Sequence, residues 1–370
     1  MSEYQYYEFQ AIDRPLTREE MAELRSCSSR ARISSTRFTN EYHWGDFKGN
    51  STEWMKRYFD AHLYTSNFGS RVFSLRFPIA WMDPKTIHPY QVEGAVEVSK
   101  TKSHLILSFL LDTEPGEYDE EEGNDGLLAD LLPIRSALAA GDRRALYIGW
   151  LGGAQNGLVD PDAVEPAVPP GLGSDGGSLD ALIGFLNLRE DLVVAAARNS
   201  PEASPPPTTG EIATWLAEVD GKEKDQWLSR LLLADDPGMR GEVLNRLHQT
   251  SDSMQSRGKS TRTVESLLSE ADNLEAERME KQRQEIARQE HARIMALAGQ
   301  EVGLWQSVIK LSDSSSSRYQ ETAIRTLKDL RELASIRSDS AVFLEKLEGF
   351  IELRCRKSSF MKLLRDAGFT

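Results

Sequence analysis

Cysteine is scarce in this chain, and its scarcity excludes a disulfide-based architecture. Cys27 and Cys355 are the only cysteines among 370 residues, and they lie far apart. Two such residues provide no disulfide framework and fit a protein of the reducing cytoplasm. No CxxC, HExxH or paired HxH motif occurs, so a zinc site is not expected. The sequence therefore predicts a cytoplasmic protein with no metal or other cofactor.

Long apolar runs and an excess of positive charge are also missing. No run reaches the ~18 apolar residues of a membrane-spanning helix, so no membrane partner is expected. The first residues, MSEYQYYEFQ, lack the basic and apolar regions of a secretory signal. The formal net charge is −14. Such an acidic chain is a poor default binder of nucleic acid, because phosphate neutralisation supplies most non-specific affinity.

The short motifs that mark common enzyme classes are absent as well. The sequence contains no GxxxxGK[ST] phosphate loop, no GxGxxG after a predicted strand and no GxSxG nucleophile turn. The glycines of PPGLGSDGG stand beside prolines and follow no predicted strand, which favours a linker over a phosphate-binding loop. These absences favour a protein that is not an enzyme.

A repeated charge pattern is the most informative feature that is present. Residues 274–293 read LEAER, MEKQR, QEIAR and QEHAR, with Glu second and Arg fifth in each pentad. Each Glu and Arg are three residues apart, a spacing at which they form ion pairs worth ~0.2–0.5 kcal/mol on a helix. A five-residue step rotates ~500°, or ~140° beyond a full turn, so the ion pairs wind around the helix; this favours a solvated spacer helix over the alternative, a dimeric coiled coil. The pattern predicts a long, solvated helix over 262–299.

Aromatic and alternating apolar residues predict an α+β domain over residues 1–158. The expected order is β-α-β-α-β-β-β, which corresponds to a mixed sheet with helices on one face. Thr17 and Glu20 form a capping-box pattern at the first helix. Ser51 is expected to cap the second helix, which apolar residues at i,i+4 spacing extend to Leu63. The predicted strands and helices cover, in order, 4–12, 17–28, 31–44, 51–63, 71–77, 95–99 and 104–111.

The remaining sequence predicts an all-α region. Residues 159–177 are rich in proline and glycine and are interpreted as a linker. Short helices are expected in a middle region at 178–250. The long charged helix follows at 262–299, and a small helical bundle occupies 301–370. The four helices of this bundle are predicted near 301–311, 317–337, 340–354 and 358–367.

The turn EYHWGDFKGN is the densest polar and aromatic cluster. His43 and Asp46 within it could act as an acid–base pair or as two metal ligands. The alternative is that this segment is a strand end followed by a turn. One His with one Asp is a weak signal for a site, so this alternative is favoured. The acidic run at 119–122 could attract a cation or a basic partner, but it lacks the alternating pattern of a calcium loop and is interpreted as a solvated loop.

The C-terminal tail is the only strongly basic segment. Its cations could contact nucleic acid or an acidic partner surface. The alternative is that these cations serve only the last helix, because positively charged side chains stabilise the C-terminus of a helix. The candidate contact residues are Arg354, Arg356, Lys357, Lys362 and Arg365, opposed by Asp366 alone.

Two stretches carry a family resemblance. Residues 302–370 resemble the helical tail of bacterial SWIM zinc finger proteins, and the stretch YQYYEFQAIDRPLT…FTNEYHWGDFKG resembles the start of an uncharacterised bacterial protein family. The CxC and CxH zinc motif of SWIM proteins is absent, so their zinc and DNA binding do not carry over. The matching positions are Trp305, Val308, Tyr319, Ala323, Leu327–Ala334, Phe343, Leu347, Lys357–Leu364, Ala367 and Gly368.

These observations lead to an expected function and two alternatives. The expectation is a non-enzymatic adaptor or accessory subunit that binds other proteins through modules at either end of the charged helix. The first alternative is an accessory component of a nucleic-acid-handling or phage-defence system, with the basic tail on the phosphates. The second is an enzyme with an unfamiliar site near His43 and Asp46.

Overall fold

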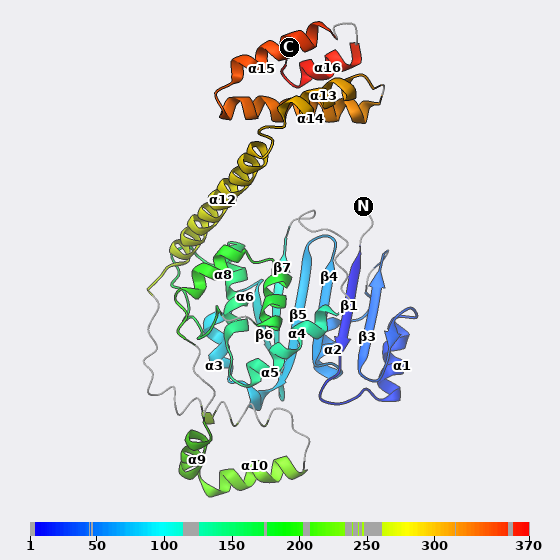
Figure 1. The fold of residues 1–370 in the computed structure, drawn as a ribbon. Helices are drawn as coiled ribbons and strands as arrows, with labels where there is room; N and C mark the ends of the chain where they lie inside the picture. Colours follow the sequence, from blue (N-terminus) through cyan, green and yellow to red (C-terminus); the bar gives the residue numbers. More distant parts are fainter. Residues whose placement is uncertain are drawn as a thin grey trace. The chain divides into compact units, whose positions relative to one another are not determined.

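The computed structural model divides into two compact units, Met1–Glu275 (unit 1) and Ala276–Thr370 (unit 2) (Figure 1). The boundary falls inside one continuous helix, α12 (Val264–Met295). The structure describes residues 4–43, 45, 47–113, 126–173, 176–202, 208–233, 239, 243, 246–247, 261–314, 316–353 and 358–369. Within these ranges, no helix is long and apolar enough to cross a membrane.

Unit 1 is built on a seven-stranded sheet with the order β2-β3-β1-β4-β5-β7-β6. The predicted α+β class, followed by an all-α region, is confirmed. The sheet is antiparallel throughout rather than mixed. The reason is that β1 lies between β3 and β4, which would otherwise form a parallel pair across α2. The strands are β1 (Gln5–Gln10), β2 (Arg32–Ile33), β3 (Arg37–Tyr42), β4 (Ala61–Ser66), β5 (Ser70–Pro78), β6 (Val96–Lys100) and β7 (His104–Asp112).

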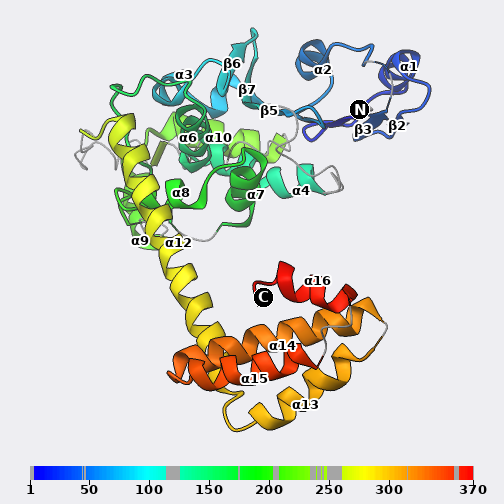
Figure 2. The same ribbon diagram turned by 90° about the horizontal axis from the view of Figure 1, so that it is seen from above.

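Helices cover both faces of this sheet, whereas the sequence predicted one covered face. Alternation along β1 places Tyr6 on one face and Phe9 on the other, and both side chains are buried. Phe9 packs with α1 (Arg18–Cys27) and α2 (Ser51–Arg57). Figure 2 shows these two helices on the side of the sheet opposite α4 and α7. The helices of the Tyr6 face are α4 (Leu127–Leu131), α5 (Pro133–Ala139), α6 (Arg144–Gln155), α7 (Gly177–Phe185) and α8 (Glu190–Ala197).

The start of α1 agrees with the sequence, but the end of α2 does not. Thr17 and Glu20 form the expected capping box. The second helix is capped by Asn50 rather than Ser51, and it ends at Arg57. Of the residues that were predicted to continue it, 58–60 form a turn and 61–63 belong to β4, which pairs with both β1 and β5. Hydrogen-bonded pairing on both sides stabilises a strand here more than local i,i+4 contacts would stabilise a helix. Tertiary structure therefore overrides the helical spacing.

One apolar core joins segments that the sequence assigned to different regions. Leu107 of β7, Leu182 of α7 and Leu267 of α12 are all fully buried in it. The described part of the predicted linker also packs here, since Glu165 is 2% exposed. The remaining elements of unit 1 are α3 (Pro84–Ile87), the short 3-10 turns η1 (Ile79–Trp81) and η2 (His88–Tyr90), and helices α9 (Thr209–Glu218) and α10 (Gly221–Leu233).

Unit 2 contains the end of α12 and a helical bundle with its own core. Its buried side chains include Leu327, Phe343 and Phe360. The helix boundaries lie within about two residues of those predicted, which is the usual uncertainty at helix ends. The bundle helices are α13 (Glu301–Ser312), α14 (Ser317–Ile336), α15 (Ser340–Glu352) and α16 (Ser358–Asp366).

Candidate functional site

A basic cavity of about 600 Å³ opens in unit 1 where four chain segments meet. These segments are the loop after β1, the end of α2, the last part of β5 and the turn between β6 and β7. Every lining side chain is polar or charged. The lining residues are Asp13, Arg14, Lys56, Arg57, Arg76, Thr101, Lys102, Ser103 and His104. Five cations and one acid therefore line a cavity in a chain of net charge −14.

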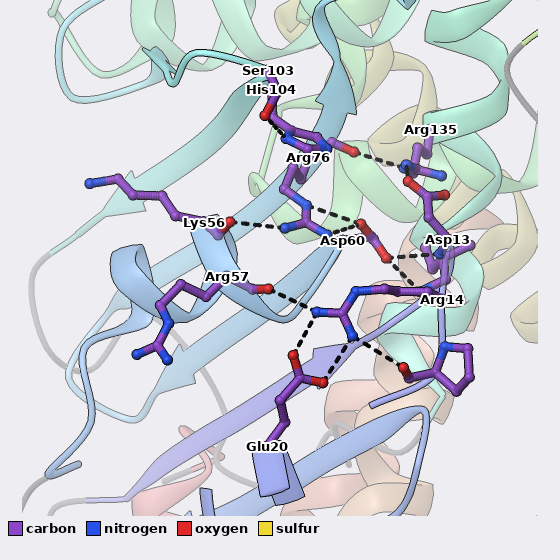
Figure 3. A network of polar contacts seen from close by, with 12 residues as sticks. Asp13, Arg14, Glu20, Lys56, Arg57, Asp60, Arg76, Ser103, His104 and Arg135 are labelled. Carbon is purple, nitrogen blue, oxygen red and sulfur yellow. Dashed lines mark hydrogen bonds and ion pairs between the residues drawn. The ribbon is translucent and has the colours of Figure 1, made fainter. Parts of the chain in front are cut away.

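A buried ion pair forms the floor of this cavity (Figure 3). Arg76 donates from Nε and Nη2 to Oδ1 of Asp60, at 3.0 and 2.7 Å. The other oxygen, Oδ2, accepts from the backbone N–H groups of Ile12 and Asp13, at 2.7 and 2.9 Å. The Asp60 side chain is 1% exposed. Because all these donors converge on one carboxylate, the loop after β1 is held rigidly against β5.

Two further arginines fix the wall. Arg135 of α5 donates to Oδ2 of Asp13 at 2.7 Å and to the backbone carbonyl of Arg76 at 2.9 Å. Arg14 makes a bidentate pair with Glu20 at 2.9 and 2.6 Å. The Arg14 guanidinium lowers the pKa of the Glu20 carboxyl to about 2. The single acid in the lining, Asp13, is thus already neutralised by a cation from outside it.

The rim consists of longer and more exposed cations. Lys56 contacts Glu53 at 2.8 Å and Arg57 contacts Glu23 at 3.0 Å, with all four side chains at least a third exposed. Such exposed pairs contribute only ~0–1 kcal/mol, so these cations can exchange partners at low cost. Lys102 is exposed and forms no ion pair with any described residue.

His104 lies at the start of β7, beside this rim. Its Nδ1 is 2.8 Å from the Ser103 hydroxyl oxygen. Partial burial lowers the pKa of His104, and the positive charge of Arg76 lowers it further. The imidazole is therefore neutral near pH 7.

The candidate residues from the sequence lie elsewhere. His43 is exposed, with its ring 5.3 Å from that of Tyr4, and it does not line the cavity. Asp46 and the acidic run at 119–122 lie outside the described residues. The proposed roles of His43 and Asp46 therefore stay predictions. In the part of the chain that is described, no three potential metal ligands come together.

The basic tail is described only in part. Lys362 and Arg365 are exposed on α16, while Phe360 and Leu364 of the same helix are buried in the bundle core. Arg354, Arg356 and Lys357 lie outside the described residues. Both interpretations of the tail therefore remain predictions.

Sequence reasoning missed the basic cavity because its residues come from four separate segments. The available signal was a set of polar groups at the ends of elements: Asp13-Arg14 after β1, Lys56-Arg57 at the end of α2, and Lys102 in a hairpin turn. Nothing local indicates that these ends meet.

Comparisons with known proteins add no assignment. The chain matches no protein-family model, no curated protein and no solved structure.

Proposed function

We propose that this protein is a non-enzymatic cytoplasmic adaptor whose two units bind different partners. One observation carries the proposal: the middle of α12 belongs to neither core. Every residue from 276 to 289 is exposed. The helix is supported there by its own charges, with Arg283–Glu280 at 3.1 Å and Arg288–Glu285 at 3.5 Å.

Such a segment has no packing role, so its use is to connect. Helices in small domains take most of their stability from an apolar face packed on a core. A solvated stretch carrying ion pairs keeps its helical conformation without such a face. Two units with separate cores that share one continuous helix are the arrangement expected of a connector between two binding modules.

Site-specific photo-crosslinking in the native host tests this proposal. A photoreactive residue would replace exposed apolar side chains in unit 1 (Leu158, Val194) and in unit 2 (Val302, Leu344). Ile286, 59% exposed in the solvated stretch, is the matched control. We expect one protein to be captured from unit 1 positions, a different one from unit 2 positions, and none from Ile286. Identical products at all positions, or no product at any, would contradict the proposal.

An insertion in α12 distinguishes between a connector that orients the two partners and a tether that only joins them. Two residues added after Gln284 rotate the following part of the helix by ~200° relative to the preceding part. If both partners must be oriented, the variant should bind each partner but fail to bring them together. Unchanged bridging would mean that α12 is only a tether.

A further inference from the structure

We propose that the basic cavity of unit 1 binds a small, densely charged polyphosphate compound. This inference does not depend on the adaptor proposal, because it rests on the cavity alone. Its first support is charge. Asp13, the single acid in the lining, is paired with Arg135 at 2.7 Å. Of the five lining cations, Arg14 and Arg76 are held by Glu20 and Asp60, which leaves the three cations of the rim to attract an anion.

The cations divide into a fixed floor and an adaptable rim. Arg76 is held by Asp60 and by the backbone carbonyl of Lys56, so it shapes the cavity but has little left to donate. Lys56, Arg57 and Lys102 extend from two sides, the end of α2 and the β6–β7 turn. Their carboxylate partners, where present, are exposed and can be displaced by a stronger anion.

Phosphate suits this donor arrangement better than carboxylate does. A carboxylate has two oxygens in one plane and is best matched by one bidentate arginine. A phosphoryl group has three terminal oxygens spread around phosphorus, so it can accept from cations on opposite sides of a cavity. The rim supplies two lysines and one arginine from two chain segments.

The lining also limits the rest of the ligand. No apolar side chain lines the cavity, and its single aromatic ring is the partly buried imidazole of His104, so little there would stack on a nucleobase. The volume of about 600 Å³ falls in the usual range for small-molecule sites and exceeds what one phosphate needs. Together these features favour a compound with several phosphoryl groups and no extended apolar part.

Titration calorimetry of the full chain with pyrophosphate at low salt tests the proposal. We expect one site per chain, tighter binding of pyrophosphate than of sulfate, and no gain for ATP over tripolyphosphate. Lys102→Ala and Arg57→Ala should each weaken binding about tenfold, the loss of one charge-assisted hydrogen bond. Lys100→Ala is the matched control, because Lys100 is exposed two residues away and does not line the cavity. It should change affinity less than twofold.

A second readout distinguishes the cavity from diffuse attraction. His104 faces Arg76, Asp60, Asp13 and Arg135, and a bound polyanion should raise its pKa in an NMR titration. Absence of binding at low salt, an equal loss in Lys100→Ala, or an unchanged His104 would overturn the proposal. Tighter binding of ATP than of tripolyphosphate would overturn the ligand class.

Discussion

Two stretches of α12 show how one helix can be held by different forces. Its first turns place Val264, Leu267 and Ala271 in the core of unit 1, each at most 1% exposed. From 276 to 289 every residue is exposed, and the neighbouring contacts are ion pairs along the helix. A buried leucine contributes a few kcal/mol, whereas an exposed pair contributes a few tenths. The first stretch therefore anchors the helix, and the second only keeps it helical.

The largest loss of stability is expected from a substitution just before α12 begins. Arg262 donates to both oxygens of Glu165, at 2.9 and 2.7 Å, and the Glu165 side chain is fully buried. Arg262→Met leaves that carboxylate without its cation and should cost unit 1 about 3–5 kcal/mol in urea unfolding. Adding Glu165→Leu should restore much of the loss, because no unpaired charge then remains buried. A double variant as unstable as the single one would refute this explanation.

A matched pair of truncations tests the contrast within the helix itself. Leu267→Ala removes a fully buried side chain and should destabilise unit 1 by about 2–5 kcal/mol, because the core cannot close completely around the gap. Ile286→Ala, at 59% exposure on the same helix, should change stability by less than about 0.5 kcal/mol. The measurement is urea unfolding followed by circular dichroism. Equal losses would mean that the two stretches are held alike.

Lowering the pH tests the contrast between buried and exposed groups further, because the two kinds of group change protonation over different pH ranges. Burial lowers the pKa of His62 from 6.5 to about 3. Between these values the unfolded chain binds a proton that the folded chain does not, so stability falls as pH falls, by about 1.4 kcal/mol per pH unit. His62→Phe should remove about 2–3 kcal/mol of the loss between pH 6.5 and 4.5.

The Glu–Arg ion pairs of α12 should not contribute to the change in stability between pH 6.5 and 4.5. Arg293 lowers the pKa of Glu290, so the stabilisation from this pair is present above the ordinary Glu value of 4.5 and is lost only at lower pH. Parallel pH profiles of the wild type and the His62→Phe variant would contradict the assignment to His62.

The smallest effect is expected from the helix charges. Glu280→Gln with Glu285→Gln removes two exposed ion pairs and should cost less than about 1 kcal/mol. Hydrogen exchange should accelerate between 276 and 293 and stay unchanged in the core of unit 1. High salt should have the same effect on the wild type, because it screens exposed charges. A large shift in unit 1 stability would show that these pairs also support the core.

Local patterns allowed correct prediction where neighbours along the chain decide the conformation. The pentads predicted α12, and Thr17 with Glu20 predicted the start of α1, because both depend on contacts three or four residues apart. β4 was missed for the opposite reason. Leu63 follows apolar residues at helical spacing, but its partners are β1 and β5. The basic cavity was missed likewise, since its four segments are far apart in sequence.

The amino-acid sequence alone therefore determined the class of the fold, the long charged helix and the helical bundle at its end. Each of these follows from periodicity, capping and charge spacing, which act over a few residues. Only the tertiary structure decided that β1 separates β3 from β4, that Glu165 and Arg262 tie α12 to unit 1, and that five cations surround one cavity. These features depend on burial and pairing between distant segments, and the free energy of such contacts exists only once the chain has folded.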